Sequence, residues 1–175
     1  MIKKITFLFF FFSFLMLSAQ LTNEGQPVSW DMVETKAEMP AISLDRIDIQ
    51  KLRNEDQIND IEPGKPWRYG VVRSVNYGLN KGGYWTDLDN GDRIWRIQFE
   101  SPEAVNLSFN FSKFYIPEGA HLYLYSDDRT ELIGAFTSQL NNEDNMLGSS
   151  MVKSDKVWLE SVSYTHLTLP TTSRV

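Results

Sequence analysis

The sequence predicts an all-β protein: an antiparallel, jelly-roll-like β-sandwich, preceded by a signal peptide and an acidic leader with one short helix. Three observations favour this class. Beyond residue 66, apolar and polar residues alternate with a period of two in several short runs. Turn-forming residues separate these runs at roughly 8 to 12 residue spacing. The 175-residue chain, with 42% hydrophobic and 13% aromatic residues, suits one domain with a core.

Residues 1–19 have the features of a secretory signal peptide. Lys3 and Lys4 form a basic start, and an apolar run rich in Phe and Leu follows as far as Leu17. This run is shorter than the roughly 20 residues that a membrane-spanning helix needs. The small residue Ala19 predicts cleavage between Ala19 and Gln20, so we expect a secreted or periplasmic protein with no membrane association after cleavage. The alternative is an uncleaved anchor, but no basic cluster follows the run.

Residues 20–65 form a polar leader that carries much of the acid of the chain. Its aliphatic residues are sparse, so we expect a leader that is not part of the core. They are partly helix-periodic over residues 48–59, which predicts one short amphipathic helix. We interpret Glu55, Asp56 and Asp60 as the solvated face of that helix. Metal binding is the less favoured alternative, because carboxylates at this spacing occur on many surface helices.

Residues 66–160 are expected to form the β-sandwich, and a hairpin is predicted between 84–88 and 93–99 because the residues between them favour a turn. Apolar and polar side chains alternate along the second strand, so we expect one face in the core and one in water. An aromatic and β-branched run at 67–74 and later runs near 107–111, 122–125, 131–136 and 157–160 extend the pattern. The predicted core residues are Trp95, Ile97, Phe99, Leu107, Phe109, Phe111, Leu122 and Leu124.

The acidic turn of the predicted hairpin is a weak candidate for a metal site. Oxygens of Asp87, Asp89 and Asp92 could surround a calcium ion. However, Gly91 stands where a calcium-binding loop has an oxygen ligand, and no Glu follows at the closing distance. A hairpin turn explains these residues better, so we expect no metal and no cofactor.

Composition excludes several classes of function. The formal net charge is −6, and basic residues form no run after the first few positions, so nucleic-acid binding is not expected. The chain has no cysteine, which excludes a disulfide scaffold, a thiolate metal site and a cysteine nucleophile.

The last residues, 161–175, look foreign to the rest of the sequence. The run from Val162 to Thr171 matches, without a gap, a translated transposase adapter of the kind used in sequencing libraries. We therefore expect the native reading frame to be interrupted after Glu160 and the natural protein to continue. His166 is then not native. The alternative is a genuine Thr-rich strand and tail.

Several short motifs form a recognisable combination. They are Gly91-Asp92-Arg93-Ile94-Trp95-Arg96-Ile97, Ser101-Pro102, Ile116-Pro117-Glu118-Gly119-Ala120, Leu122-Tyr123-Leu124-Tyr125 and Ile133-Gly134-Ala135-Phe136-Thr137. Together with the upstream Trp67-Arg68-Tyr69-Gly70, they resemble the amino-terminal region of secreted bacterial lysyl endopeptidase precursors, which are trypsin-like serine proteases. The similarity runs from about Met39 to Glu160. It implies a pro-region whose partner is the protease domain downstream in the same precursor.

No catalytic residue is assigned in this chain. A trypsin-like protease needs a His base, an Asp that orients it and a Ser within a Gly-Asp-Ser-Gly-Gly stretch, and that stretch does not occur. His121 directly precedes a predicted strand, which indicates a histidine at a strand end. The parent precursor is expected to be a serine endopeptidase, with its catalytic residues in the downstream domain.

A binding module for cell-surface glycan or protein is the rival function. It would use Trp67, Tyr84, Trp85 and Tyr125 as an exposed aromatic platform. We favour the alternative that these aromatic side chains pack in the core of the domain or around its edge. The preferred function is therefore a non-catalytic pro-region that assists folding of its protease or covers the substrate cleft.

Overall fold

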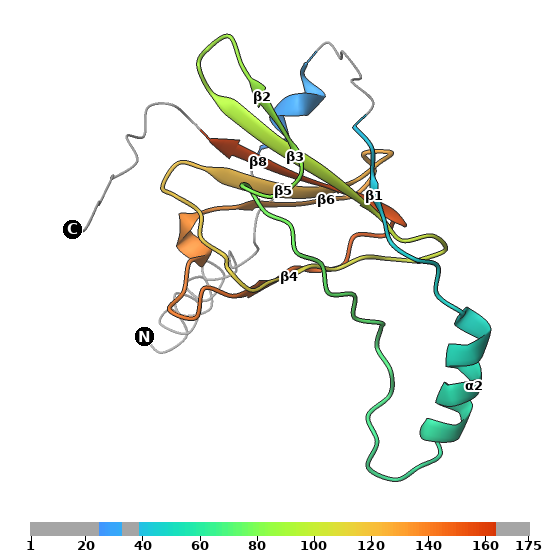
Figure 1. Cartoon of the computed structure of the whole chain (residues 1–175). Coiled ribbons are helices and arrows are strands. Elements are labelled where there is room, and N and C mark those ends of the chain that lie inside the picture. Colours follow the sequence, from blue (N-terminus) through green and yellow to red (C-terminus); the bar gives the residue numbers. More distant parts are fainter. Residues whose placement is uncertain (1–24, 33–38, 164–175) are drawn as a thin grey trace, which may run out of the picture.

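The computed structural model describes residues 25–32 and 39–163, and its main feature is a six-stranded sheet (Figure 1). The strands run in the order β1-β3-β8-β5-β6, and β2 also pairs with β3. Their bounds are β1 Ile42–Ser43, β2 Tyr84–Asp87, β3 Arg93–Glu100, β5 His121–Ser126, β6 Leu132–Phe136 and β8 Lys156–Ser163. The predicted all-β class is confirmed. The sheet is mixed, because β1 runs parallel to β3 while the other pairs are antiparallel.

A second, two-stranded sheet lies against one face of the large sheet (Figure 1). It consists of β4 (Asn110–Phe111) and β7 (Leu147–Gly148), which pair antiparallel. Phe111 and Leu147 pack against the buried core. The two layers of the predicted sandwich are therefore very unequal in size, because the run at 107–111 forms only a short strand and a single bridge from Leu107 to Val152.

The predicted hairpin is present as β2 and β3. Trp85 pairs with Trp95, and Asp87 pairs with Arg93. The turn is closed by a hydrogen bond from the Leu88 amide to the Asp92 carbonyl, with an N···O distance of 2.8 Å. Its turn chemistry was sufficient to place the hairpin because the interaction is local in sequence.

The core lies between the two sheets. Of the predicted core residues, Trp95, Ile97, Phe99, Leu122 and Leu124 are buried, and Leu107, Phe109 and Phe111 are partly buried against them. Phe114, Ile116, Phe136, Val152, Val157 and Leu159 complete the cluster. Packing explains why the residue before β2 is a glycine. A Cβ on Gly83, whose φ is +74°, would lie only 2.5 Å from Nε1 of Trp95, so any larger side chain would clash with the indole ring.

The second face of the large sheet is also buried, and our expectation that it faces water is wrong. Ile94, Tyr123, Tyr125 and Val162 form a second apolar cluster there. Residues 25–32, with the short 3-10 helix η2 (Val28–Trp30), lie over this cluster and contribute Val28, Trp30 and Met32. Residues 25–32 belong to the segment that was predicted to be a leader. The alternation of apolar and polar residues along β3 could not predict that this distant segment covers the second face of the sheet.

The leader contributes two more elements. One is β1, which extends the sheet beside the second half of β3 through the pairs Ile42 with Phe99 and Ser43 with Glu100. The other is the helix α2 (Ile49–Asn59), which agrees with the predicted helix at 48–59. Asp48 caps α2 by accepting a hydrogen bond from the Lys51 amide at 2.9 Å. The described parts of the predicted leader, residues 25–32 and 39–65, therefore include both packed and projecting elements.

The last strand ends later than the sequence predicts. Strand β8 runs to Ser163, past the expected native end at Glu160, and Val162 within it is fully buried. Residues 164–175, with His166, and the signal segment 1–19, with its cleavage site at Ala19 and Gln20, lie outside the described residues. Another short 3-10 helix, η3, spans Ser138–Leu140. No helix in the described parts of the chain is long and apolar enough to cross a membrane.

Candidate protein-interaction surface

Residues 45–83, which we call the arm, project from the large sheet (Figure 1). Helix α2 leads away from β1, and the chain then turns and returns to β2. No residue of the arm is buried. The rest of the described chain, namely residues 25–32, 39–44 and 84–163, is called the body. An element with no buried side chain gains little from packing, so the arm is available for contact with another surface.

The returning part of the arm, residues 66–77, belongs to no helix or strand. The aromatic and β-branched composition at 67–74 indicated a strand, but in the structure this stretch has no strand partner. Its large apolar side chains are widely exposed, with relative exposures of 79% for Trp67, 84% for Tyr69 and 84% for Val72. Ile58 and Ile61, at 71% and 81%, add to them from the end of α2 and the turn that follows.

Polar contacts hold this returning segment to α2 and to the body. The Arg68 guanidinium contacts Glu55 Oε2 and Asp56 Oδ1, each at 2.8 Å. The hydrogen bond to Glu55 raises the pKa of Arg68, so the guanidinium stays charged. Further along, Arg73 donates to the Asp45 carbonyl at 2.8 Å, and the Tyr69 hydroxyl lies 3.2 Å from the sulfur of Met151. These contacts give the arm a defined shape without burying it.

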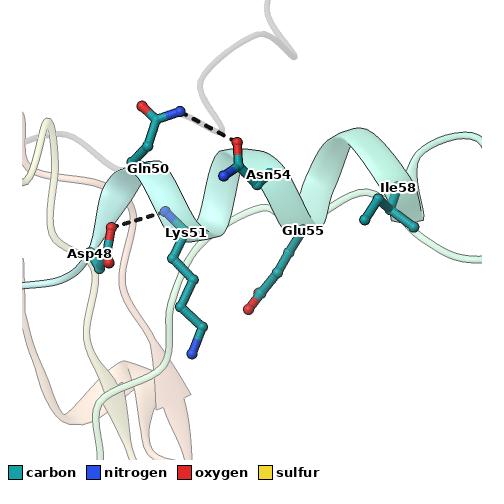
Figure 2. Close-up of a pocket in the computed structure, with 6 residues that line it drawn as sticks. All are labelled: Asp48, Gln50, Lys51, Asn54, Glu55 and Ile58. Atoms are coloured by element: carbon teal, nitrogen blue, oxygen red, sulfur yellow. Dashed lines mark hydrogen bonds between the residues drawn. The ribbon is translucent and has the colours of Figure 1, made fainter.

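Helix α2 has a small groove of about 440 Å³ along one side. Figure 2 shows its lining, which comes entirely from the helix and its cap: Asp48, Gln50, Lys51, Asn54, Glu55 and Ile58. The groove holds no His and no cluster of carboxylates, and Glu55 is engaged by Arg68. Among the described residues, no group of three or more His, Cys, Asp or Glu side chains could hold a metal ion.

The acidic hairpin turn is organised by its own hydrogen bonds. The Asp87 carboxylate forms an ion pair with Arg93, its partner on the neighbouring strand, at 2.6 Å. Asn90 donates to Asp92 Oδ2 at 2.6 Å and accepts from the Asp92 amide at 3.0 Å. The structure therefore does not bring the carboxylates of Asp87, Asp89 and Asp92 together as a set of ligands.

The four aromatic residues of the rival platform do not form one surface. Tyr125 is only 4% exposed and lies in the second cluster, against Trp30. Tyr84 and Trp85 are neighbours on β2, so their side chains point to opposite faces. Trp85 contacts the Arg93 guanidinium at 4.6 Å, and Trp67 lies on the arm.

His121 is the first residue of β5 and is partly buried. Its ring lies near the Tyr123 ring, with a centroid distance of 6.3 Å. Burial lowers the pKa of His121, which favours the neutral imidazole. No serine of a protease-type loop accompanies it, since the sequence contains no such stretch.

A buried polar cluster was not found by sequence reasoning. Glu160, which is 0% exposed, accepts hydrogen bonds from the Ser29 amide at 3.1 Å, the Ser29 hydroxyl at 2.5 Å and the Tyr125 hydroxyl at 3.0 Å. Burial, and then the charge of Glu160, raise the pKa of Tyr125, so its hydroxyl remains a donor. The only signal in the sequence was a Glu directly after the apolar residues Val157 to Leu159, and nothing marked Ser29 as its partner.

Comparison with known protein families gives a match over residues 39–170 to the lysyl endopeptidase N-terminal domain. The match covers most of the chain. The chain belongs to the lysyl endopeptidase N-terminal domain family. The resemblance drawn from the short motifs is thus confirmed, and the chain is the N-terminal region of a lysyl endopeptidase precursor. No solved structure matches the chain. The family match takes in the whole arm, so the arm is part of the lysyl endopeptidase N-terminal domain.

Proposed function

We propose that this chain is the non-catalytic pro-region of a secreted lysyl endopeptidase precursor and that it associates with the protease domain downstream in the same precursor. The observation that carries the proposal is the arm: a segment of the family domain that is shaped by specific contacts and nevertheless has no buried residue. The absence of a serine-protease sequence motif in this chain supports a catalytic site in the downstream domain.

The physical basis of the proposed association is the apolar surface of the arm. Trp67, Tyr69 and Val72 are exposed at positions where burial against a partner would remove large apolar areas from water. Aromatic side chains at the centre of an interface often carry most of the binding energy. A partner that binds only the folded protease stabilises it by mass action, which is how a pro-region assists folding. Residues 45–62 carry more acidic than basic side chains, and this excess would complement a more basic partner surface.

Export is the second part of the proposal. We expect cleavage after Ala19, so that the secreted protein begins at Gln20. Mass spectrometry of the protein recovered from the culture medium or the periplasm measures this directly. A recovered product that retains the apolar run before Leu17 would contradict it.

A refolding assay tests the association. The denatured catalytic domain of a lysyl endopeptidase is diluted from denaturant with and without the purified chain, and hydrolysis of a lysyl peptide substrate reports the yield. We expect a higher yield, or an inhibited but co-eluting protease, when the chain is present. The double variant Trp67→Ala and Tyr69→Ala should lose this effect. Tyr115→Ala is the matched control, because Tyr115 is 69% exposed but lies on the body.

Two outcomes would overturn the proposal. One is an unchanged refolding yield together with no co-elution of chain and protease. The other is an equal loss of effect in the arm variant and in Tyr115→Ala, which would remove the arm from the interaction. Hydrolysis of the peptide by the chain alone would contradict its non-catalytic role.

A further inference from the structure

Residues 71–77, in the part of the arm that returns to β2, have the side-chain pattern of a β-strand although no strand pairs with them (Figure 1). Val71, Val75 and Tyr77 are 42%, 46% and 43% exposed, whereas Val72 is 84% exposed. The less exposed apolar residues are thus all at odd-numbered positions. In an extended chain, residues two apart point to the same side, so one side of this segment is partly covered and the other faces solvent.

Contacts with other parts of the domain hold the covered side in place. Arg73 donates to the carbonyl of Asp45, the second residue after β1, at 2.8 Å. The Tyr77 ring meets the ring of the buried Phe99 edge to face, with a centroid distance of 5.6 Å. The segment therefore has a defined position next to the large sheet.

The backbone of this segment is unpaired. Among the described residues, no backbone N–H or C=O group of residues 67–77 forms a hydrogen bond with another backbone group. The nearest such bonds belong to the turns on either side, where the Lys65 amide donates to Glu62 and the Gly78 amide donates to Lys81. A row of unpaired backbone groups along an extended chain is a template on which another strand can form.

We propose, on the basis of the function proposed above, that residues 71–77 pair as a strand with an open strand edge of the downstream protease domain. Backbone hydrogen bonds then form much of the contact, and the side chains at alternate positions fix its register. Trp67 and Tyr69, which directly precede the segment and are widely exposed, extend the contact with apolar area.

The composition and the attachment of the segment both favour this mode of binding. Val71, Val72, Val75 and Tyr77 are β-branched or aromatic residues, which favour strands. The ion pairs of Arg68 with α2 lie before the segment, and the contact between Tyr77 and Phe99 lies at its end. A segment that is held in this way loses less conformational entropy when it binds.

Two observations favour the protease domain as the partner. First, the chain is the N-terminal region of a lysyl endopeptidase precursor, so the two domains are parts of one polypeptide and meet at a high effective concentration. A second copy of the chain has no such advantage. Second, residues 66–80 contain no lysine, so a lysyl endopeptidase finds no lysyl bond to cut within the strand that it binds.

A proline scan of residues 71–76 tests the proposal, with binding measured by calorimetry against a lysyl endopeptidase whose active-site serine is blocked. Successive N–H groups of a strand point to opposite edges, so only every second amide faces the partner. Proline at those positions removes a hydrogen bond and should weaken binding by about 10-fold. Proline at the positions between them should change binding little, so the effects should alternate along the segment.

The free chain should tolerate these substitutions. None of the replaced amides has a backbone acceptor, and none of these residues has a positive φ. Circular dichroism checks that each variant melts like the unmodified chain. Val71→Ala and Val72→Ala shorten the same side chains but keep the N–H group, so they separate loss of the side chain from loss of the hydrogen bond. Val105→Pro is the matched control, because Val105 is an exposed valine on the body.

Amide hydrogen exchange, followed by NMR, provides a second readout that involves no substitution. In the free chain, the amides of residues 71–77 should exchange rapidly, because they are exposed and have no backbone acceptor. In the complex with the blocked protease, alternate amides of the segment should become protected. The amides of β3 should be protected in both states, because β3 is paired with β8 along its whole length.

Failure of this inference can be distinguished from failure of the proposed function. If the chain binds the protease but the amides of residues 71–77 gain no protection, or if all prolines have equal effects, strand pairing is overturned while the association stands. Protection in the free chain at high concentration, together with a dimer in sedimentation, would assign the edge to a second copy and would also overturn the inference. If the chain does not bind the protease, the proposed function fails as well.

Discussion

The body and the arm of this domain are built on different principles. The body has two apolar clusters, one on each face of the large sheet, and side chains such as Leu124 and Val157 have no exposure at all. The arm has no buried residue and is held by ion pairs and hydrogen bonds. Since burial of apolar area is the main stabilising term in folding, the body determines the stability of the domain. The arm contributes little to that stability, in keeping with the proposal that it contacts a partner.

The largest predicted effect is a difference in stability between a substitution in the body and a substitution in the arm. Leu124→Ala should lower the free energy of unfolding by about 2 to 5 kcal/mol, because it leaves a cavity in the core. Trp67→Ala removes a larger side chain but should change the free energy by less than about 0.5 kcal/mol, because Trp67 is 79% exposed. Urea denaturation followed by circular dichroism measures both. Equal losses would show that the arm is part of the cooperative core.

Sequence patterns correctly predicted the elements in which the interacting residues are close together in the sequence. The β2–β3 hairpin and the helix α2 were predicted from turn chemistry and from periodicity, and both are present. The cover on the second face could not be predicted in this way. Ser29 and Glu160 are separated by 131 positions, and no pattern in either segment indicates the other. Long-range packing of this kind is decided by the whole fold.

The candidate surface was predicted only in part. Residues 20–65 were expected to form an acidic leader outside the core, and residues 45–65 of it lie on the arm. The apolar side chains at 67–74 were expected in a strand, since aromatic and β-branched residues favour strands. No neighbouring strand is available to them in the structure, because β3 already pairs with β1 and β2 along its outer edge. Exposure of Trp67 and Tyr69 therefore follows from the topology.

The second prediction tests whether residues 25–32 belong to the body. Glu160→Ala removes the acceptor for the Ser29 amide, the Ser29 hydroxyl and the Tyr125 hydroxyl. Buried donors without acceptors cost about 1 to 3 kcal/mol, so the free energy of unfolding should fall by this amount. Glu118→Ala, at an exposed position, is the matched control and should have little effect.

Hydrogen exchange gives the same prediction a local readout. In Glu160→Ala, the amides of residues 28–31 should exchange faster than those of β3, because the segment loses its attachment while the sheet remains paired. Unchanged exchange at Ser29 would show that apolar contacts through Val28 and Trp30 are sufficient to hold the segment.

The smallest predicted effect is a pH dependence confined to the body, at the turn between β5 and β6. Asp128 accepts hydrogen bonds from the Ser126 hydroxyl at 2.6 Å and from the Thr130 amide and hydroxyl at 3.1 and 2.8 Å. The Ser126 bond is the main reason that the pKa of Asp128 lies below its ordinary value of 3.8. A carboxyl group whose pKa is lowered by folding stabilises the fold above its unfolded pKa, and this stabilisation is lost as the pH falls through the folded value.

The melting temperature of the unmodified chain should therefore exceed that of Asp128→Asn at neutral pH, and the difference should shrink below pH 3.8. Because Asp128 is exposed and the contacts are local, the difference should be smaller than that caused by Glu160→Ala. A difference that persists unchanged in acid would mean that the substitution acts through the geometry of the turn, with no contribution from the charge of Asp128.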